Sequence, residues 1–182
     1  WPADYRYELG GEAENSASGL LAVAEQLPLA GFIIVLLLIL QFNSVRKTVI
    51  VLGAIPLGLI GVVLGLTLFR SYFGFFAFLG IISLAGIIIK NAIVLLDRIQ
   101  LEQDENGLPP WEAILAACQQ RLRPILLTTF TTTLGLLPLY LGGGLMWEPM
   151  AIGIMIGLLF GTVSTLLFVP VLYRLLYGVG AK

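Results

Sequence analysis

The amino-acid sequence predicts an all-α fold, a polytopic membrane bundle of five transmembrane helices with one further helix at the cytoplasmic interface. Of the 182 residues, 58% are hydrophobic and only 12% are charged. A soluble domain of this length could not bury so much apolar surface. In addition, five charge-free runs each approach or exceed the roughly 20 residues that a spanning helix needs.

The segment before the first membrane helix has a different character. In residues 1–19, apolar and charged side chains alternate from Tyr5 to Leu9, a pattern typical of a short half-buried strand. A helix is expected to begin near Glu12 and to continue into the first span. Because the chain starts at Trp1 without a methionine, we interpret it as a piece of a longer polypeptide, with residues 1–19 ending a water-exposed domain. A naturally short membrane protein is the alternative.

The membrane helices follow in order along the chain. The first contains Pro28, and charged residues separate most of the apolar runs. We expect membrane helices over residues 20–45, 46–69, 72–98, 123–144 and 148–176, and a cytoplasmic tail over 177–182.

The loop over residues 99–122 contains a helix of another kind. Pro109 and Pro110 stand where a helix can start, because proline is compatible with the first helical turn. Apolar residues then recur at helical spacing with polar residues opposite, at Trp111, Ile114, Leu115, Cys118 and Leu122. Such an amphipathic helix can lie along the cytoplasmic interface or pack on the protein's own spans.

Lysine and arginine residues give the orientation, because positively charged residues of short loops remain in the cytoplasm. The loops on one side carry only Arg70 and Glu148. The loops on the other side, with the end of the chain, carry Arg46, Lys47, Arg98, Arg121, Arg123, Arg174 and Lys182. We therefore expect the C-terminus in the cytoplasm of a bacterial inner membrane protein and the N-terminal segment in the periplasm.

Composition excludes several classes of site. The net charge is -1 and the basic residues are scattered, so nucleic acid is not expected as a partner. With no histidine and a single cysteine, Cys118, the chain cannot form a Cys/His metal site or an internal disulfide. No cofactor and no enzymatic chemistry are expected.

Glycine residues occur at helix-packing spacing in two spans. Gly61 and Gly65 form one GxxxG pair, and Gly153, Gly157 and Gly161 form two such pairs in tandem. Small residues four apart let helix backbones approach closely in a bilayer, where no hydrophobic force drives association. We interpret these five residues as helix-packing positions.

Lys90 lies inside the third span, about 10 Å from Asp97 along the helix. Insertion scales give roughly 2.5 to 3.5 kcal/mol for a lysine at the centre of a span, and such residues usually face a polar partner. Ser83 and Asp97 are each seven residues from Lys90, so all three share one helix face. Asn91 borders this face. The alternative is a structural lysine whose ammonium reaches the interface.

The fourth span has a polar face of its own. Arg121 and Thr128 are seven residues apart, and Thr128 should lie level with Lys90 because the two helices run in opposite directions. For Thr129 and Thr133 we expect a hydroxyl that bonds back to its own helix and faces lipid.

A buried lysine requires an anionic partner. Between residues 71 and 147 every acidic residue lies at or beyond the cytoplasmic end of the third span. The partner carboxylates must therefore come from helices outside this chain, or Lys90 is neutral because desolvation disfavours its charged form.

Three long motifs resemble, in order, the last three membrane helices of resistance-nodulation-division (RND) efflux permeases. They are "GFFAFLGIISLAGIIIKNAIVLLDRI", "WEAILAACQQRLRPILLTTFTTTLGLLPL" and "GGGLMWEPMAIGIMIGLLFGTVSTLLFVPVLY". The upstream "YRYELGGEAENSASGLLAVAEQLPLA" resembles the junction between the periplasmic porter region and the eighth helix of that family.

The resemblance implies that the chain is the eighth to twelfth helices, half of the transmembrane domain, of a homotrimeric proton antiporter. Such permeases pass their cargo to a periplasmic adaptor and an outer-membrane channel. It also implies that Lys90 pairs with carboxylates of an absent helix, and that Arg121 and Thr128 belong to the same proton relay. Asn91 adjoins Lys90 in the matching segment.

The resemblance and the residues leave the exported cargo and the wider class open. Lys90 and a low methionine content favour the hydrophobe and amphiphile class, as in multidrug resistance, over the heavy-metal class. One alternative is a protein-export or lipid-handling relative of the SecD/SecF type. Another is a non-transporting membrane scaffold, in which the glycine faces are the whole purpose.

Overall fold

The computed structural model describes residues 11–178, apart from the side chains of residues 12, 13 and 15. Within this range the chain is helical and contains no strand. The strand expected between Tyr5 and Leu9 lies outside the described residues. The helices are α1 (Glu12–Phe42), α2 (Val45–Gly53), α3 (Ile55–Leu68), α4 (Phe75–Asp104), α5 (Pro110–Gly142) and α6 (Gly144–Tyr177).

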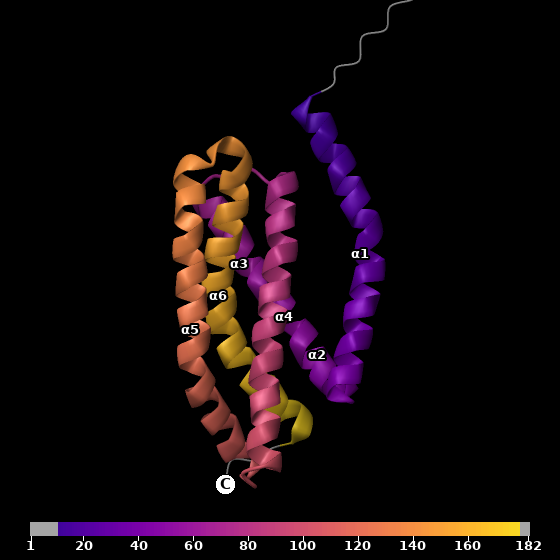
Figure 1. Cartoon of the computed structure of the whole chain (residues 1–182), viewed down its shortest axis with the longest axis vertical. Helices are drawn as coiled ribbons and strands as arrows, with labels where there is room; N and C mark the ends of the chain where they lie inside the picture. Colours follow the sequence, from indigo (N-terminus) through magenta and orange to yellow (C-terminus); the bar gives the residue numbers. More distant parts are fainter. Residues whose placement is uncertain (1–10, 179–182) are drawn as a thin grey trace, which may run out of the picture.

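Five segments of the described chain are long and apolar enough to cross a membrane: α1, α2 with α3, α4, α5 and α6. They run alternately in opposite directions (Figure 1). The turn after α1, the turn after α4 and the end of α6 lie at one end of the bundle, which corresponds to the end expected in the cytoplasm. The predicted all-α bundle of five membrane helices is confirmed.

The second span is broken into α2 and α3 near Pro56. A proline has no N–H to donate to the carbonyl four residues earlier, and its ring crowds the preceding turn. The chain adjusts at Ala54, whose N–H bonds to the Val51 carbonyl three residues back at 3.2 Å. The span therefore bends without losing its course through the bundle.

The helix expected in the loop 99–122 is present but is not separate. It begins at Pro110, as the sequence predicts, and continues without a break through Pro124 to Gly142 as α5. Ala113 and Ala117 are fully buried against the other helices. Packing on the protein's own spans, rather than lying along the interface as an independent helix, accounts for its apolar face.

Helix α4 is longer than expected at the same end. It continues past Asp97 to Asp104, and only residues 105–109 connect it to α5. Because α4 and α5 both extend beyond the apolar spans, they form an antiparallel pair at that end (Figure 1). Lys90 is consequently near the middle of a 30-residue helix.

Helix α6 is packed most closely against α3, through glycine. A Cβ atom added to Gly61 would lie 2.7 Å from Phe160 Cβ and 3.0 Å from Gly157 Cα. One added to Gly65 would lie 2.8 Å from Ile156 Cβ. These distances are too short for any larger side chain, so the two backbones meet at positions where only glycine fits.

The other face of the same glycine register receives α4. A Cβ at Gly157 would meet Leu84 Cδ2 at 2.5 Å, and one at Gly161 would meet Ile88 Cδ1 at 3.0 Å. Gly153 is less tightly enclosed, 3.4 Å from Val62 Cγ1. Helix α6 thus lies between α3 and α4 and forms the centre of the bundle (Figure 1).

Helix α1 is the least buried of the five spans in the described chain. In the most apolar 18-residue stretch of α1 only 6% is buried, against 50% in the corresponding stretch of α6. Leu38 and Phe42, near its end, are buried where it turns into α2. Its middle bows away from α4 (Figure 1), and towards its start a Cβ at Gly19 would lie 3.0 Å from the Phe75 ring of α4. Pro28 lies inside this helix, which begins at Glu12 as expected.

Replacing Gly61 by alanine should destabilise the bundle. The new methyl group would meet a Cβ and a backbone Cα that cannot move without displacing α6, and overpacking of this kind costs about 1–3 kcal/mol. Thermal unfolding of the full-length detergent-solubilised protein measures the effect. Gly135→Ala is the matched control, because nothing lies within 4 Å of its Cβ position; equal melting temperatures for the two variants would contradict the packing argument.

Candidate functional site

Helix α4 separates apolar and polar residues onto opposite faces. Ile88, Ala92 and Leu95 are at most 1% exposed and pack into the core. Lys90 and Asp97 are exposed on the opposite face. Lys90, although it lies within a membrane span, therefore points away from the core of these six helices.

The four residues predicted for the proton relay line one groove between α4 and α5. Lys90 and Asn91 come from α4, and Arg121 and Thr128 come from α5. The groove has a volume of about 110 Å³ and is completed by apolar groups of Val94, Pro124 and Ile125. Lys90 and Thr128, for which helix geometry predicts equal depth, thus line the same groove.

Both cationic groups of the groove have unused hydrogen-bonding capacity. The Lys90 ammonium forms no ion pair with any side chain that the structure describes. Arg121 Nε is enclosed and has no acceptor within residues 11–178. Thr128 donates its hydroxyl hydrogen to the Ile125 carbonyl at 2.9 Å, which leaves the oxygen free to accept. The groove is therefore suited to an anionic group, and a carboxylate is the simplest complement.

The remaining threonines of α5 fall into two environments. Thr131 donates to the Leu127 carbonyl of its own helix at 2.9 Å and is exposed. The same behaviour was expected of Thr129 and Thr133, and that expectation is wrong. Thr129 is buried and hydrogen-bonds across to Thr162 of α6 at 2.8 Å, while the enclosed Thr133 hydroxyl has no partner in the described chain. Periodicity could not reveal this, because the partner is on another helix.

A polar network centred on a buried carboxylate joins α4 to α5 at the end expected in the cytoplasm. The Glu102 carboxylate, 2% exposed, is 2.6 Å from the Arg98 guanidinium. It also accepts hydrogen bonds from Asn106 at 2.6 Å and from Gln120 of α5 at 2.9 Å. The sequence signal for this network is an Arg98–Glu102 pair at i,i+4 spacing, which is common on exposed helices and does not predict burial.

Aromatic and basic side chains fasten α6 at the same end. Arg174 lies 5.0 Å from the ring centre of Trp111, and Arg46 lies 5.9 Å from that of Tyr177. Tyr173 stacks on Tyr177 with ring centres 4.5 Å apart. Trp111 of the amphipathic part of α5 therefore contacts α6 rather than lying free at the interface.

Two solved structures with this arrangement are crystal forms of a heavy metal efflux pump. One has 28% sequence identity and a TM-score of 0.79, and the matched region covers 97% of this chain and 18% of the pump chain. The other has 27% identity and a TM-score of 0.77, and the matched region covers 96% of this chain and 18% of the pump chain. The model of the AcrB/AcrD/AcrF family matches residues 1–177.

The chain belongs to the AcrB/AcrD/AcrF family. The resemblance to RND efflux permeases is thereby confirmed, and with it membership of a family of transporters rather than enzymes. The chain spans about a fifth of the length of the heavy metal efflux pump that it matches. It carries five candidate membrane helices of such a permease among its described residues.

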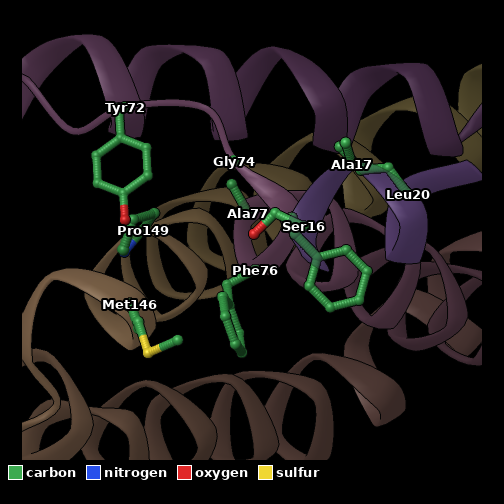
Figure 2. Close-up of a pocket in the computed structure, with 10 residues that line it drawn as sticks. Ser16, Ala17, Leu20, Tyr72, Gly74, Phe76, Ala77, Met146 and Pro149 are labelled. Carbon is green, nitrogen blue, oxygen red and sulfur yellow. The ribbon is translucent and has the colours of Figure 1, made fainter. Parts of the chain in front are cut away.

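A second hollow in this family member lies at the opposite end of the bundle from the Glu102 network. Its volume is about 490 Å³, and Figure 2 shows Ser16, Ala17 and Leu20 of α1 on one side and Tyr72, Met146 and Pro149 on the other. The Tyr72 ring points towards the start of α6, where its hydroxyl donates to the Leu145 carbonyl at 2.6 Å. The full lining is Ser16, Ala17, Leu20, Tyr72, Gly74, Phe75, Phe76, Ala77, Met146 and Pro149.

This hollow lies where the start of α1 meets the start of α4, a tertiary contact that no motif predicts. Its walls are mainly aromatic and aliphatic, with two hydroxyl groups, a surface suited to the apolar part of an amphiphile or a lipid. None of the residues predicted for the proton relay lines it. The two sites are therefore separate.

Replacing Glu102 by alanine should lower the melting temperature of the full-length protein. The change removes the acceptor through which Arg98 and Asn106 on the α4 side are linked to Gln120 of α5, a charge-assisted contact between two helices. Glu105→Ala serves as the control, since Glu105 is exposed three residues later on the same chain segment. The network would have no structural importance if the two variants melted together.

Proposed function

We propose that this chain is the C-terminal transmembrane part of a proton-driven efflux permease and supplies one side of its intramembrane proton relay. In this proposal Lys90 is the charge that changes partner, and Arg121, Thr128 and Asn91 support the proton path. The single observation that carries it is the groove in which these four residues meet. No covalent chemistry is required.

Electrostatics supports a pairing partner for Lys90. A lysine at the centre of a span costs roughly 2.5 to 3.5 kcal/mol unless it is compensated. An ionised carboxylate from a helix outside this chain would compensate it on the exposed face of α4. Protonation of that carboxylate removes the attraction and releases the ammonium. The pair therefore forms when the carboxylate is deprotonated and separates when a proton arrives, which couples proton entry to movement of α4.

The family and the direction of the helices support a membrane location and an orientation for the chain. We propose a multi-pass protein of the bacterial inner membrane, with the start of α1 on the periplasmic side and the end of α6 in the cytoplasm. The arrangement of the helices in Figure 1 is compatible with it, since their ends alternate between two sides. Its proposed partners are the rest of the permease, two further copies, a periplasmic adaptor and an outer-membrane channel.

For the cargo we propose hydrophobic or amphiphilic compounds. Lys90 supports this class, and the aromatic hollow beside α1 suits the apolar part of such a molecule. Heavy-metal ions are the second candidate. The likeness to a heavy metal efflux pump at 28% identity favours it.

Lys90→Ala in the full-length permease should abolish proton-coupled export. The groove would lose the charge that responds to the carboxylate, while the outward-facing position tolerates a smaller side chain without disturbing the core. Export from vesicles under an imposed pH gradient measures the effect, with membrane insertion checked in parallel. Lys47→Ala is the matched control, because Lys47 lies outside the groove and bonds to Gln100. Export at the native rate by a correctly inserted Lys90→Ala protein would refute the relay.

The cargo class can be separated by transport of two probes. Vesicles containing the full-length permease should export ethidium, a hydrophobic cation, when a pH gradient is imposed. They should not export Ag⁺ or Zn²⁺ under the same gradient. Export of the metal ions without ethidium would replace the proposed class by the heavy-metal class. Vesicles carrying the Lys90→Ala protein provide the baseline for both probes.

A further inference from the structure

Helix α5 buries few side chains over its membrane part. Beyond Pro124, its only buried residues are Ile125 and Thr129. Just 11% of its most apolar window is buried, compared with 33% for α4. Hydrocarbon side chains gain little by choosing a protein neighbour over lipid, so apolar packing alone does not determine how such a helix is rotated.

The hydrogen bond between Thr129 and Thr162 supplies what apolar packing lacks. The two hydroxyl oxygens are 2.8 Å apart, and each residue is 2% exposed. The bond joins α5 to α6, the helix that is fixed at the centre of the bundle by its glycine contacts with α3. It therefore ties the rotation of α5 to the most constrained element of the structure.

The rotation of α5 decides where Thr128 points. Successive residues of a helix are about 100° apart, so directing Thr129 towards α6 turns Thr128 towards a different neighbour. In the structure that direction is the groove lined by Lys90 and Asn91 of α4. If α5 turned by one residue, Thr128 would leave the groove.

We propose that Thr162 is a positioning residue for the groove, acting through Thr129 to hold Thr128 beside Lys90. This inference rests on the proposed role of Thr128 in proton coupling. Thr162 itself is not among the residues that line the groove, so it acts at one remove. It is the part of α6 that determines the geometry of a site formed by α4 and α5.

The chain offers a matched control one turn further along α6. Thr165 is 3% exposed, like Thr162, but its hydroxyl has no hydrogen-bond partner among the described residues. Replacing either threonine by valine removes one buried hydroxyl while keeping the shape of the side chain. Only the change at Thr162 removes a bond between helices.

The test uses the full-length permease in vesicles, with ethidium as the probe, or Ag⁺ where the native pump exports that instead. Thr162→Val should lower the export rate by about 3- to 20-fold, the range that corresponds to one interhelical hydrogen bond in a membrane. It should also move the midpoint of the pH–rate profile in the same direction as Thr128→Val does. Thr162→Ser should restore export, and Thr165→Val should leave it unchanged.

A double variant shows whether Thr162 acts through Thr128. Thr128→Val combined with Thr162→Val should export no more slowly than Thr128→Val alone, because the positioned group is already gone. Multiplied losses would overturn the inference, as would a native export rate for Thr162→Val. Native export by a correctly inserted Thr128→Val protein would instead refute the proposed relay role of Thr128, on which the inference rests.

Discussion

The contact between α3 and α6 is the constraint to which the other helices of this bundle are adjusted. In a bilayer, helices associate through close packing and polar contacts, since lipid is as apolar as their side chains. Gly61 and Gly157 allow the two backbones to approach until there is no room for a Cβ atom. Gly157 and Gly161 of α6 also make room for Leu84 and Ile88 of α4. One helix is thus held from two sides, and its position determines theirs.

This packing has a direct effect on the polar residues of α4. Because Leu84 and Ile88 must face α6, the face opposite them must turn away from the bundle, and that face carries Lys90 and Asp97. At Lys90, helix α5 lies beside this face. The groove formed there brings together cations, a hydroxyl and an amide without an acid. This composition supports the charge-pairing role that we propose for the groove.

Polar contacts between helices differ in character along the bundle. At the end expected in the cytoplasm, Glu102 combines an ion pair with hydrogen bonds from two amides and joins α4 firmly to α5. Within the spans, the Thr129–Thr162 bond is the one that joins α5 to α6 among the described hydrogen bonds. Burying a carboxylate is less costly near water, where its partners stay partly solvated, than in hydrocarbon. The midsection of α5 is consequently joined to α6 by one neutral hydrogen bond, whereas its first turns are joined to α4 by a charged network.

Much of this protein was determined by the sequence alone. The apolar runs predict the membrane helices, because a span must match the bilayer thickness, and helical period and rise place Lys90 and Thr128 at one depth. The continuity of the loop helix with α5 and the Thr129–Thr162 bond were decided only by tertiary structure. Both depend on which surface of another helix is available, and periodicity within one helix contains no information about that. The course of α1 has the same origin, since contacts with α4 near Gly19 and with the core at Leu38 and Phe42 set its direction.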